Sequence, residues 1–70
     1  MLIKLTEVLR TPDDKIVKRP VLIETTNVAM IKPDIYVTGP ATIYFIDDSY
    51  MTVAENLNTI LDKEAGREPD

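Results

Sequence analysis

The chain has 70 residues, of which 44% are hydrophobic and 29% charged, and its formal net charge is −4. This composition predicts one small folded domain and argues against disorder, which needs low hydrophobicity and high net charge. Because the chain has no cysteine and no histidine, disulfides, thiolate metal sites, the usual zinc sites and Ser-His or Cys-His catalysis are excluded.

The charge and hydropathy of the chain argue against nucleic acids and membranes as partners. Twelve acidic residues stand against eight basic ones, and the only basic cluster is Lys15, Lys18 and Arg19. Nucleic-acid domains usually carry a basic stripe, so nucleic-acid binding is not expected. The longest apolar runs have four residues, which is too short to cross a membrane, and the N-terminus lacks the features of a signal peptide. We therefore expect a cytoplasmic protein.

Residues 2–9 predict the first strand. Ile3, Leu5 and Leu9 alternate onto one face together with Glu7. Alternation of this kind predicts a strand with one dominant buried face.

A hairpin turn and a second strand are predicted next. Pro12 presets the backbone angle φ for the second position of a turn, and Asp13 and Asp14 suit the positions after it. Residues 15–23 regain strand character, but Pro20 cannot donate a ladder hydrogen bond. This segment is therefore predicted to be an edge strand or to break at that proline.

The middle of the chain is predicted to hold a helical turn at residues 24–27 and a third strand at residues 28–31. Residues 32–40 carry a proline near each end and a glycine, which predicts a loop. The extended middle of that loop, Ile35-Tyr36-Val37, is expected to pair weakly.

Residues 41–46 give the strongest strand prediction, because they are rich in β-branched and aromatic residues. Alternation places Ala41, Ile43 and Phe45 on one face and Thr42, Tyr44 and Ile46 on the other. After a polar turn, a last strand is predicted to begin at residue 50.

An amphipathic helix of about three turns is predicted near the C-terminus, because Leu57, Ile60 and Leu61 lie at helical spacing. Its start has two interpretations. Thr52 and Glu55 fit a capping box, whereas Asn56 fits an N-cap placed directly before the apolar stripe.

The other end of the helix is predicted from a glycine. Gly66 suits the C-terminal cap, and residues 66–70 are expected to fray.

These elements predict an α+β fold over residues 1–65, with a small antiparallel sheet of four to five short strands and one C-terminal amphipathic helix on one face. One helix covers one face only, and the other face is expected to be partly apolar through Ile31, Tyr44, Ile46 and Met51. An uncovered apolar face predicts a partner, most simply a second copy. Small domains without disulfides or metals often gain stability in this way.

The adjacent carboxylates Asp47 and Asp48 are the strongest candidates for a chemically active site. Neighbouring residues of an extended chain point to opposite faces, so a turn is favoured over an acid–base pair or a cation site. Ser49 would need an activating base, and no histidine exists. We therefore predict no catalytic residue, no metal and no cofactor. The polar side chains of this region receive structural roles, in the turn (Asp47, Asp48, Ser49) and at the cap (Thr52 or Asn56).

A second group of side chains is predicted to contact a partner or a ligand. The tyrosines could stack on bases, but packing on the sheet or at an interface is favoured. Basic residues on an edge strand often oppose edge-to-edge aggregation. The group consists of Tyr36, Tyr44, Ile46, Tyr50, Met51, Lys18 and Arg19.

The order of three segments resembles a known family. "IKLT" opens the chain, "PVLIETTNVAMI" follows, and "YMTVAENLNTIL" closes it. This arrangement is similar to the small flagellar and swarming-motility proteins of the FlbD type and to similar short proteins in phage genomes. Asp48-Ser49 stands where that family tends to have a glycine-containing turn, and the loop at residues 32–40 is longer.

The resemblance implies a β-sheet with a helix and no enzymatic activity. It also favours Asn56 as the cap, because this position matches the family's serine.

Together these features predict a small non-enzymatic module that self-associates and acts through protein–protein contacts. Two alternatives stay open. One is a phage-type inhibitor that blocks or sequesters a host factor. The other is a nucleotide sponge with a binding site between subunits.

Overall fold

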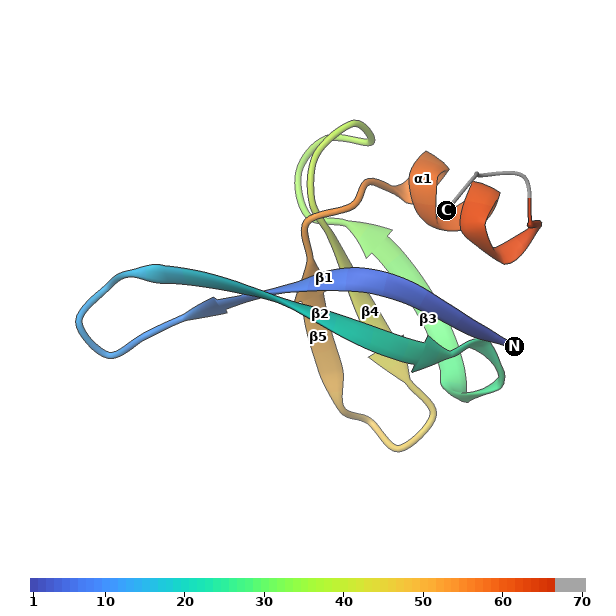
Figure 1. The fold of residues 1–70 in the computed structure, drawn as a ribbon, viewed down its shortest axis with the longest axis horizontal. Coiled ribbons are helices and arrows are strands. Elements are labelled where there is room, and N and C mark those ends of the chain that lie inside the picture. The colour runs from blue at the N-terminus through green and yellow to red at the C-terminus, as the bar shows by residue number, and fades with distance from the viewer. Residues whose placement is uncertain (67–70) are drawn as a thin grey trace.

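The computed structural model describes residues 1–66, which form a five-stranded antiparallel sheet and one helix (Figure 1). In space the strand order is β2-β1-β5-β4-β3. The predicted α+β class is therefore confirmed. The elements are β1 (Leu2–Arg10), β2 (Ile16–Glu24), a short 3₁₀ turn (Thr25–Asn27), β3 (Val28–Pro33), β4 (Ala41–Phe45), β5 (Tyr50–Val53) and α1 (Leu57–Glu64).

β1 and β2 form a long hairpin with the predicted turn between them. The Asp14 amide donates to the Thr11 carbonyl at 3.0 Å, which places Pro12 at the second turn position as expected. β2 is an edge strand and continues through Pro20, which lies opposite Thr6. The predicted edge is confirmed, and the alternative of a broken strand is wrong.

The register of the hairpin explains why Pro20 does not break the strand. At its two ends, the Thr25 amide donates to the Met1 carbonyl at 2.9 Å and the Thr11 amide to the Lys15 carbonyl at 2.8 Å. Hydrogen-bonded and non-hydrogen-bonded pairs alternate along an antiparallel ladder, so Thr6 and Pro20 form a non-hydrogen-bonded pair. The proline nitrogen thus faces the open edge, where its missing N–H breaks no ladder bond.

β3, β4 and β5 form a meander that meets the hairpin over a short contact. Glu7 of β1 lies opposite Val53 of β5, and the Ala54 amide donates to the Thr6 carbonyl at 2.8 Å. Beyond this point β1 and β5 diverge, and the distal half of the hairpin extends past the rest of the sheet (Figure 1).

The loop between β3 and β4 differs from its prediction. Residues 35–37 form no strand, because the loop closes on itself through bonds from Asp34 N to Pro40 O at 3.0 Å and from Gly39 N to Tyr36 O at 2.9 Å. The apolar middle of this loop is exposed rather than paired.

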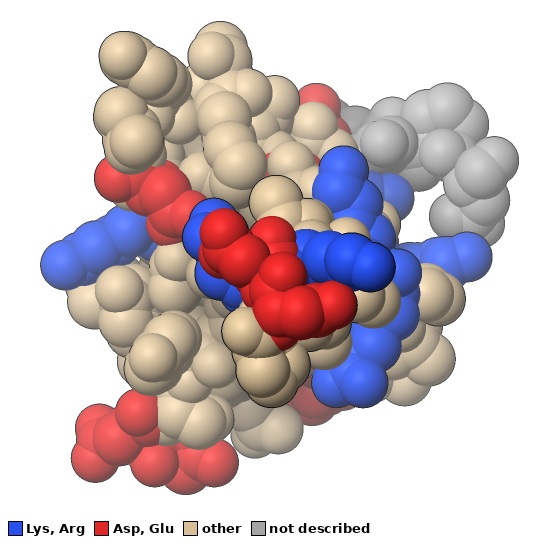
Figure 2. Space-filling model, turned by 90° about the vertical axis from the view of Figure 1, so that its left-hand side faces the viewer, with Lys and Arg blue, Asp and Glu red and all other residues tan. Residues whose placement is uncertain are grey.

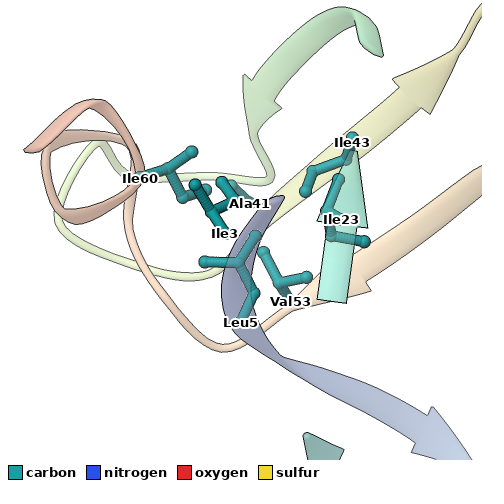
Figure 3. Packing of buried hydrophobic residues seen from close by; sticks show 7 residues of the cluster. All are labelled: Ile3, Leu5, Ile23, Ala41, Ile43, Val53 and Ile60. Atoms are coloured by element: carbon teal, nitrogen blue, oxygen red, sulfur yellow. The ribbon is translucent and has the colours of Figure 1, made fainter. Parts of the chain in front are cut away.

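The core lies between the proximal half of the hairpin, the meander and α1 (Figure 3). The predicted alternation of β4 is confirmed for its core-facing side, because Ala41 and Ile43 are fully buried and Phe45 packs against the core. The buried hydrophobic residues are Ile3, Leu5, Ile23, Ala41, Ile43, Val53 and Ile60.

Two residues expected on the opposite face belong to the core instead. Ile31 and Met51 each lie directly opposite Ile43, on β3 and β5. Directly paired residues of neighbouring strands point to the same face, so both side chains pack against the core cluster. The prediction that Ile31 and Met51 make the other face apolar is therefore wrong.

The helix begins at the predicted cap Asn56, and the predicted glycine, Gly66, directly follows the C-cap Ala65. With eight residues, α1 has about two turns rather than the three expected. The Asn56 side chain accepts the Thr59 amide at 2.8 Å, whereas Thr52 lies in β5, so the capping-box alternative is wrong. Gly66 has φ of +71° and donates its amide to the Lys63 carbonyl. Residues 67–70, part of the predicted frayed tail, lie outside the described residues.

The apolar stripe of α1 is narrower than expected. Ile60 is fully buried, but Leu61 is 47% exposed. The main contacts of the helix are with β1 and β3. The side chain that points at the core is therefore buried, and its neighbour is not.

Candidate functional site

The two Asp-Asp pairs of the chain occupy the same kind of hairpin turn. Asp48 donates its amide to the Phe45 carbonyl, and Phe45 donates its amide to the Ser49 carbonyl. The first hairpin repeats this pattern around Asp14, and both of these aspartates have positive φ, at +64° for Asp14 and +70° for Asp48. This is the three-residue hairpin loop whose last residue is left-handed.

The side chains of the β4–β5 turn serve the turn itself. Asp47 Oδ1 accepts the Ser49 amide at 3.0 Å and the Ser49 hydroxyl at 2.5 Å. These bonds stabilise the ionised carboxylate and lower the pKa of Asp47 below its usual range. A carboxylate with a lowered pKa is a weak base, so this pair is poorly suited to activating the serine.

Residues 1–66 contain no group of three or more acidic side chains that could hold a metal ion. In the same residues no helix has the length and apolar character that a membrane crossing needs.

The three predicted tyrosines do not come together. Tyr44 and Tyr50 are neighbours on β4 and β5, with ring centroids 6.1 Å apart, and Lys32 Nζ lies 5.8 Å from the centre of the Tyr44 ring. Tyr36 lies in the β3–β4 loop and is 72% exposed. The first two rings and the lysine therefore form one small aromatic and cationic surface, and Tyr36 is separate from it.

The two predicted basic contacts have different surroundings. Arg19 Nε donates to Glu7 Oε1 at 2.8 Å, and Glu7 is nearly buried. Lys18 forms no ion pair with any residue of the described chain. Adjacent strand residues point to opposite faces, so Lys18 points away from the side on which Arg19 meets Glu7.

A hollow of about 620 Å³ opens at the base of the hairpin, beside the β4–β5 turn. Its apolar lining comes from both halves of the sheet, and two carboxylates, Glu24 and Asp47, stand at it. Two of the residues predicted to contact a partner or a ligand, Ile46 and Met51, line this hollow. The lining residues on which we build below are Leu2, Leu22, Phe45, Ile46 and Met51.

The sequence pattern did not single out Leu2, Leu22 or Phe45 as contact residues. Leu2 and Leu22 are 59% and 65% exposed. The sequence did contain a signal that the two leucines lie together. Pairing in the hairpin places Leu22 opposite Lys4, and Leu2 lies on the same face as Lys4. The sequence did not indicate that the folded sheet places this face next to the β4–β5 turn.

The distal half of the hairpin, residues 8–18, is hereafter called the arm. It projects beyond the other strands (Figure 1). Its exposed large hydrophobic residues are Ile16 at 60% and Val17 at 44%. Figure 2 views the molecule from the side to which the arm points and shows acidic side chains at the front with basic ones around them.

No family model, no curated protein and no solved structure matches the chain. The resemblance to the FlbD-type family therefore stays a prediction.

Proposed function

We propose that the protein is a non-enzymatic, cytoplasmic interaction module that self-associates through its projecting arm. The main support for this proposal is the exposure of Ile16 and Val17. Both residues lie on a two-stranded ribbon that no other part of residues 1–66 covers (Figure 1).

The physical argument concerns the stability of the arm. A two-stranded hairpin is only marginally stable by itself in water. The exposed pair Arg10–Asp14, at 2.7 Å, adds little, since exposed ion pairs contribute roughly 0–1 kcal/mol. A partner that covers Ile16 and Val17 removes their apolar surface from water. This burial stabilises the bound state by about 25 cal/mol per Å². Binding is the simplest way for such an arm to become ordered.

Sedimentation velocity of two variants tests this proposal. We expect Ile16→Thr to weaken self-association, because it removes apolar contact surface while keeping β-branched strand character. Ile35→Thr is the matched control, since Ile35 is 80% exposed but lies in the β3–β4 loop. Unchanged circular dichroism spectra would show that both variants are folded. If Ile35→Thr weakened assembly as strongly as Ile16→Thr, the assignment to the arm would be wrong.

Nucleotide binding is the second candidate function, and the cluster of Tyr44, Tyr50 and Lys32 favours it. Aromatic rings stack on bases, and a lysine beside them suits phosphate. A panel of nucleotides in a thermal-shift experiment tests it. A ligand at 100 times its dissociation constant would stabilise the protein by about 2.7 kcal/mol, and Tyr50→Leu should abolish that shift. No shift with any nucleotide would contradict this function.

A further inference from the structure

The arm and the hollow have complementary surfaces. We infer that the arm of one copy enters the hollow of a second copy, so that the molecules join head to tail. This inference rests on the proposed self-association and names the surfaces that carry it.

An arm cannot fill the hollow of its own chain. Ile16 and Leu22 lie six positions apart on the continuous strand β2. At about 3.3 Å per residue, this separation is roughly 20 Å. The apolar part of the arm and the hollow thus lie at different ends of the same hairpin, and only another molecule can bring them together.

One face of the β2 part of the arm matches the chemistry of the hollow. The hollow combines exposed apolar side chains with the carboxylates of Glu24 and Asp47. On the arm, Ile16 and Lys18 are two positions apart on one strand, so they point to the same face. An isoleucine can therefore enter the apolar part while the neighbouring lysine, which has no ion-pair partner among residues 1–66, reaches a carboxylate.

Both carboxylates carry their charge at neutral pH. The Met1 ammonium group, 2.6 Å from Glu24 Oε1, lowers the pKa of Glu24 by a hydrogen bond. The Ser49 bonds lower the pKa of Asp47. Hydrogen bonds and opposite charge favour the ionised form in both cases, so the lysine would meet a carboxylate rather than a neutral acid.

The charge distribution of the whole chain supports the same pairing. Residues 1–24 carry five basic and four acidic side chains, whereas residues 25–66 carry two basic and six acidic ones. Three of those six acids, Asp34, Asp47 and Asp48, lie on the meander and its turns beside one basic residue, Lys32. A hairpin of one copy therefore meets opposite net charge on that part of another. Complementary charge of this kind guides encounter and fixes orientation.

Two symmetric alternatives are less favourable. Pairing of two β2 edges would lose a hydrogen bond at Pro20, whose nitrogen faces that edge. Stacking of two hairpins through their outer faces would bring together Lys4, Arg10 and Lys18, which share that face. Like charges placed opposite each other are destabilising.

Head-to-tail contact has a consequence that can be measured. Each copy carries one arm and one hollow, so a variant lacking either half cannot extend an assembly, but two different half-variants can still form one intact contact. Ile16→Asp removes the arm's apolar contact and adds a charge that the carboxylates repel. Ile46→Lys puts a charge in the hollow that repels Lys18. Leu22→Lys repeats the second change at another exposed lining position.

The experiment is sedimentation of each variant alone and of equal mixtures, with circular dichroism to confirm folding. We expect each variant alone to stay at the monomer mass of 7.9 kDa. A mixture of Ile16→Asp with Ile46→Lys, or with Leu22→Lys, should reach twice that mass and no more.

Three results would overturn the inference. If both hollow variants assembled like the unmodified protein, the contact would not involve the hollow, although self-association would stand. If the variants failed alone and also in mixture, the contact would be symmetric rather than head to tail. If the unmodified protein were itself monomeric, the proposed function would fail together with the inference.

Discussion

At the scale of single residues, Asp48 explains how the last hairpin closes without glycine. The FlbD-type family that the sequence resembles tends to have a glycine-containing turn here, but this chain has Asp48-Ser49 at that place. The structure instead gives the left-handed position to Asp48, with φ of +70°. Aspartate is one of the few residues other than glycine that are enriched in this left-handed region.

Replacement of Asp48 by glycine is expected to stabilise the protein. Its side chain forms no hydrogen bond or ion pair within the described chain, so the substitution changes mainly the backbone preference. We expect Asp48→Gly to raise the free energy of unfolding by about 0.5–1 kcal/mol and Asp48→Ala to lower it. Urea denaturation measures both variants. Equal effects of glycine and alanine would contradict the left-handed assignment.

Asp47 gives a prediction about acid sensitivity. Because Ser49 lowers the pKa of Asp47 in the folded state, ionised Asp47 contributes stability that is present above its unfolded pKa. That contribution is lost as the pH falls through the lower folded pKa. In Ser49→Ala the hydroxyl donor is gone, so the pKa of Asp47 should rise toward its ordinary value. An NMR titration of the Asp47 carboxyl measures this shift, and an unchanged value would contradict the bond.

At the scale of elements, local signals predicted most of the fold. The Pro12 turn, the alternating residues of β4, and the caps at Asn56 and Gly66 each depend on a few neighbouring residues. The burial of Met51 was predicted wrongly, because it depends on which strand lies opposite. Hairpin neighbours can be inferred from short turns, but the face that each strand turns to the core depends on the whole sheet.

The hollow and the contact between β1 and β5 were missed for the same reason. Both need residues far apart in the sequence, such as Leu2 and Ile46, to meet. Among the predicted contact residues, only Ile46 and Met51 line the hollow. No local pattern indicates how the sheet joins them to Leu2.

Glu55 provides the clearest link between separate elements. Its carboxylate accepts the Thr6 amide at 2.8 Å and the Thr6 hydroxyl at 2.9 Å, which ties the segment before α1 to β1. Glu55→Ala leaves a partly buried amide without this acceptor, so we expect a loss of about 1–3 kcal/mol in unfolding free energy.

Two variants accompany Glu55→Ala in urea denaturation. Glu55→Gln should lose less, because the amide oxygen can still accept from Thr6. Glu64→Ala, which removes an exposed acid on α1, should change the unfolding free energy by at most about 0.5 kcal/mol. A similar loss for Glu64→Ala and Glu55→Ala would contradict the role of this link.

The edge position of Pro20 gives a prediction about aggregation. Pro20→Thr restores an N–H on the open edge of β2 without removing a ladder bond, so edge-to-edge pairing should become possible. We expect thioflavin T binding and turbidity to rise over time. Pro12→Thr is the matched control, because Pro12 lies in the hairpin turn and not on the edge. Equal behaviour of the two variants would contradict the assigned register.

At the scale of the whole molecule, the separation of charge and the projecting arm are the features that point to function. The sequence predicted self-association through the uncovered face of the sheet, whereas we propose that the arm and the hollow form the contact. The arm supplies exposed apolar residues together with Lys18, which has no ion-pair partner among residues 1–66. The hollow supplies apolar residues with carboxylates. Because part of the attraction that we propose is electrostatic, high salt should weaken assembly.

The mass of the unmodified protein as a function of its concentration tests the central claim most directly. Sedimentation equilibrium at low and at high salt is suited to this measurement. We expect a mass that exceeds 7.9 kDa, rises with concentration and falls when salt is added. A mass that stays at the monomer value across the whole concentration range at low salt would contradict self-association.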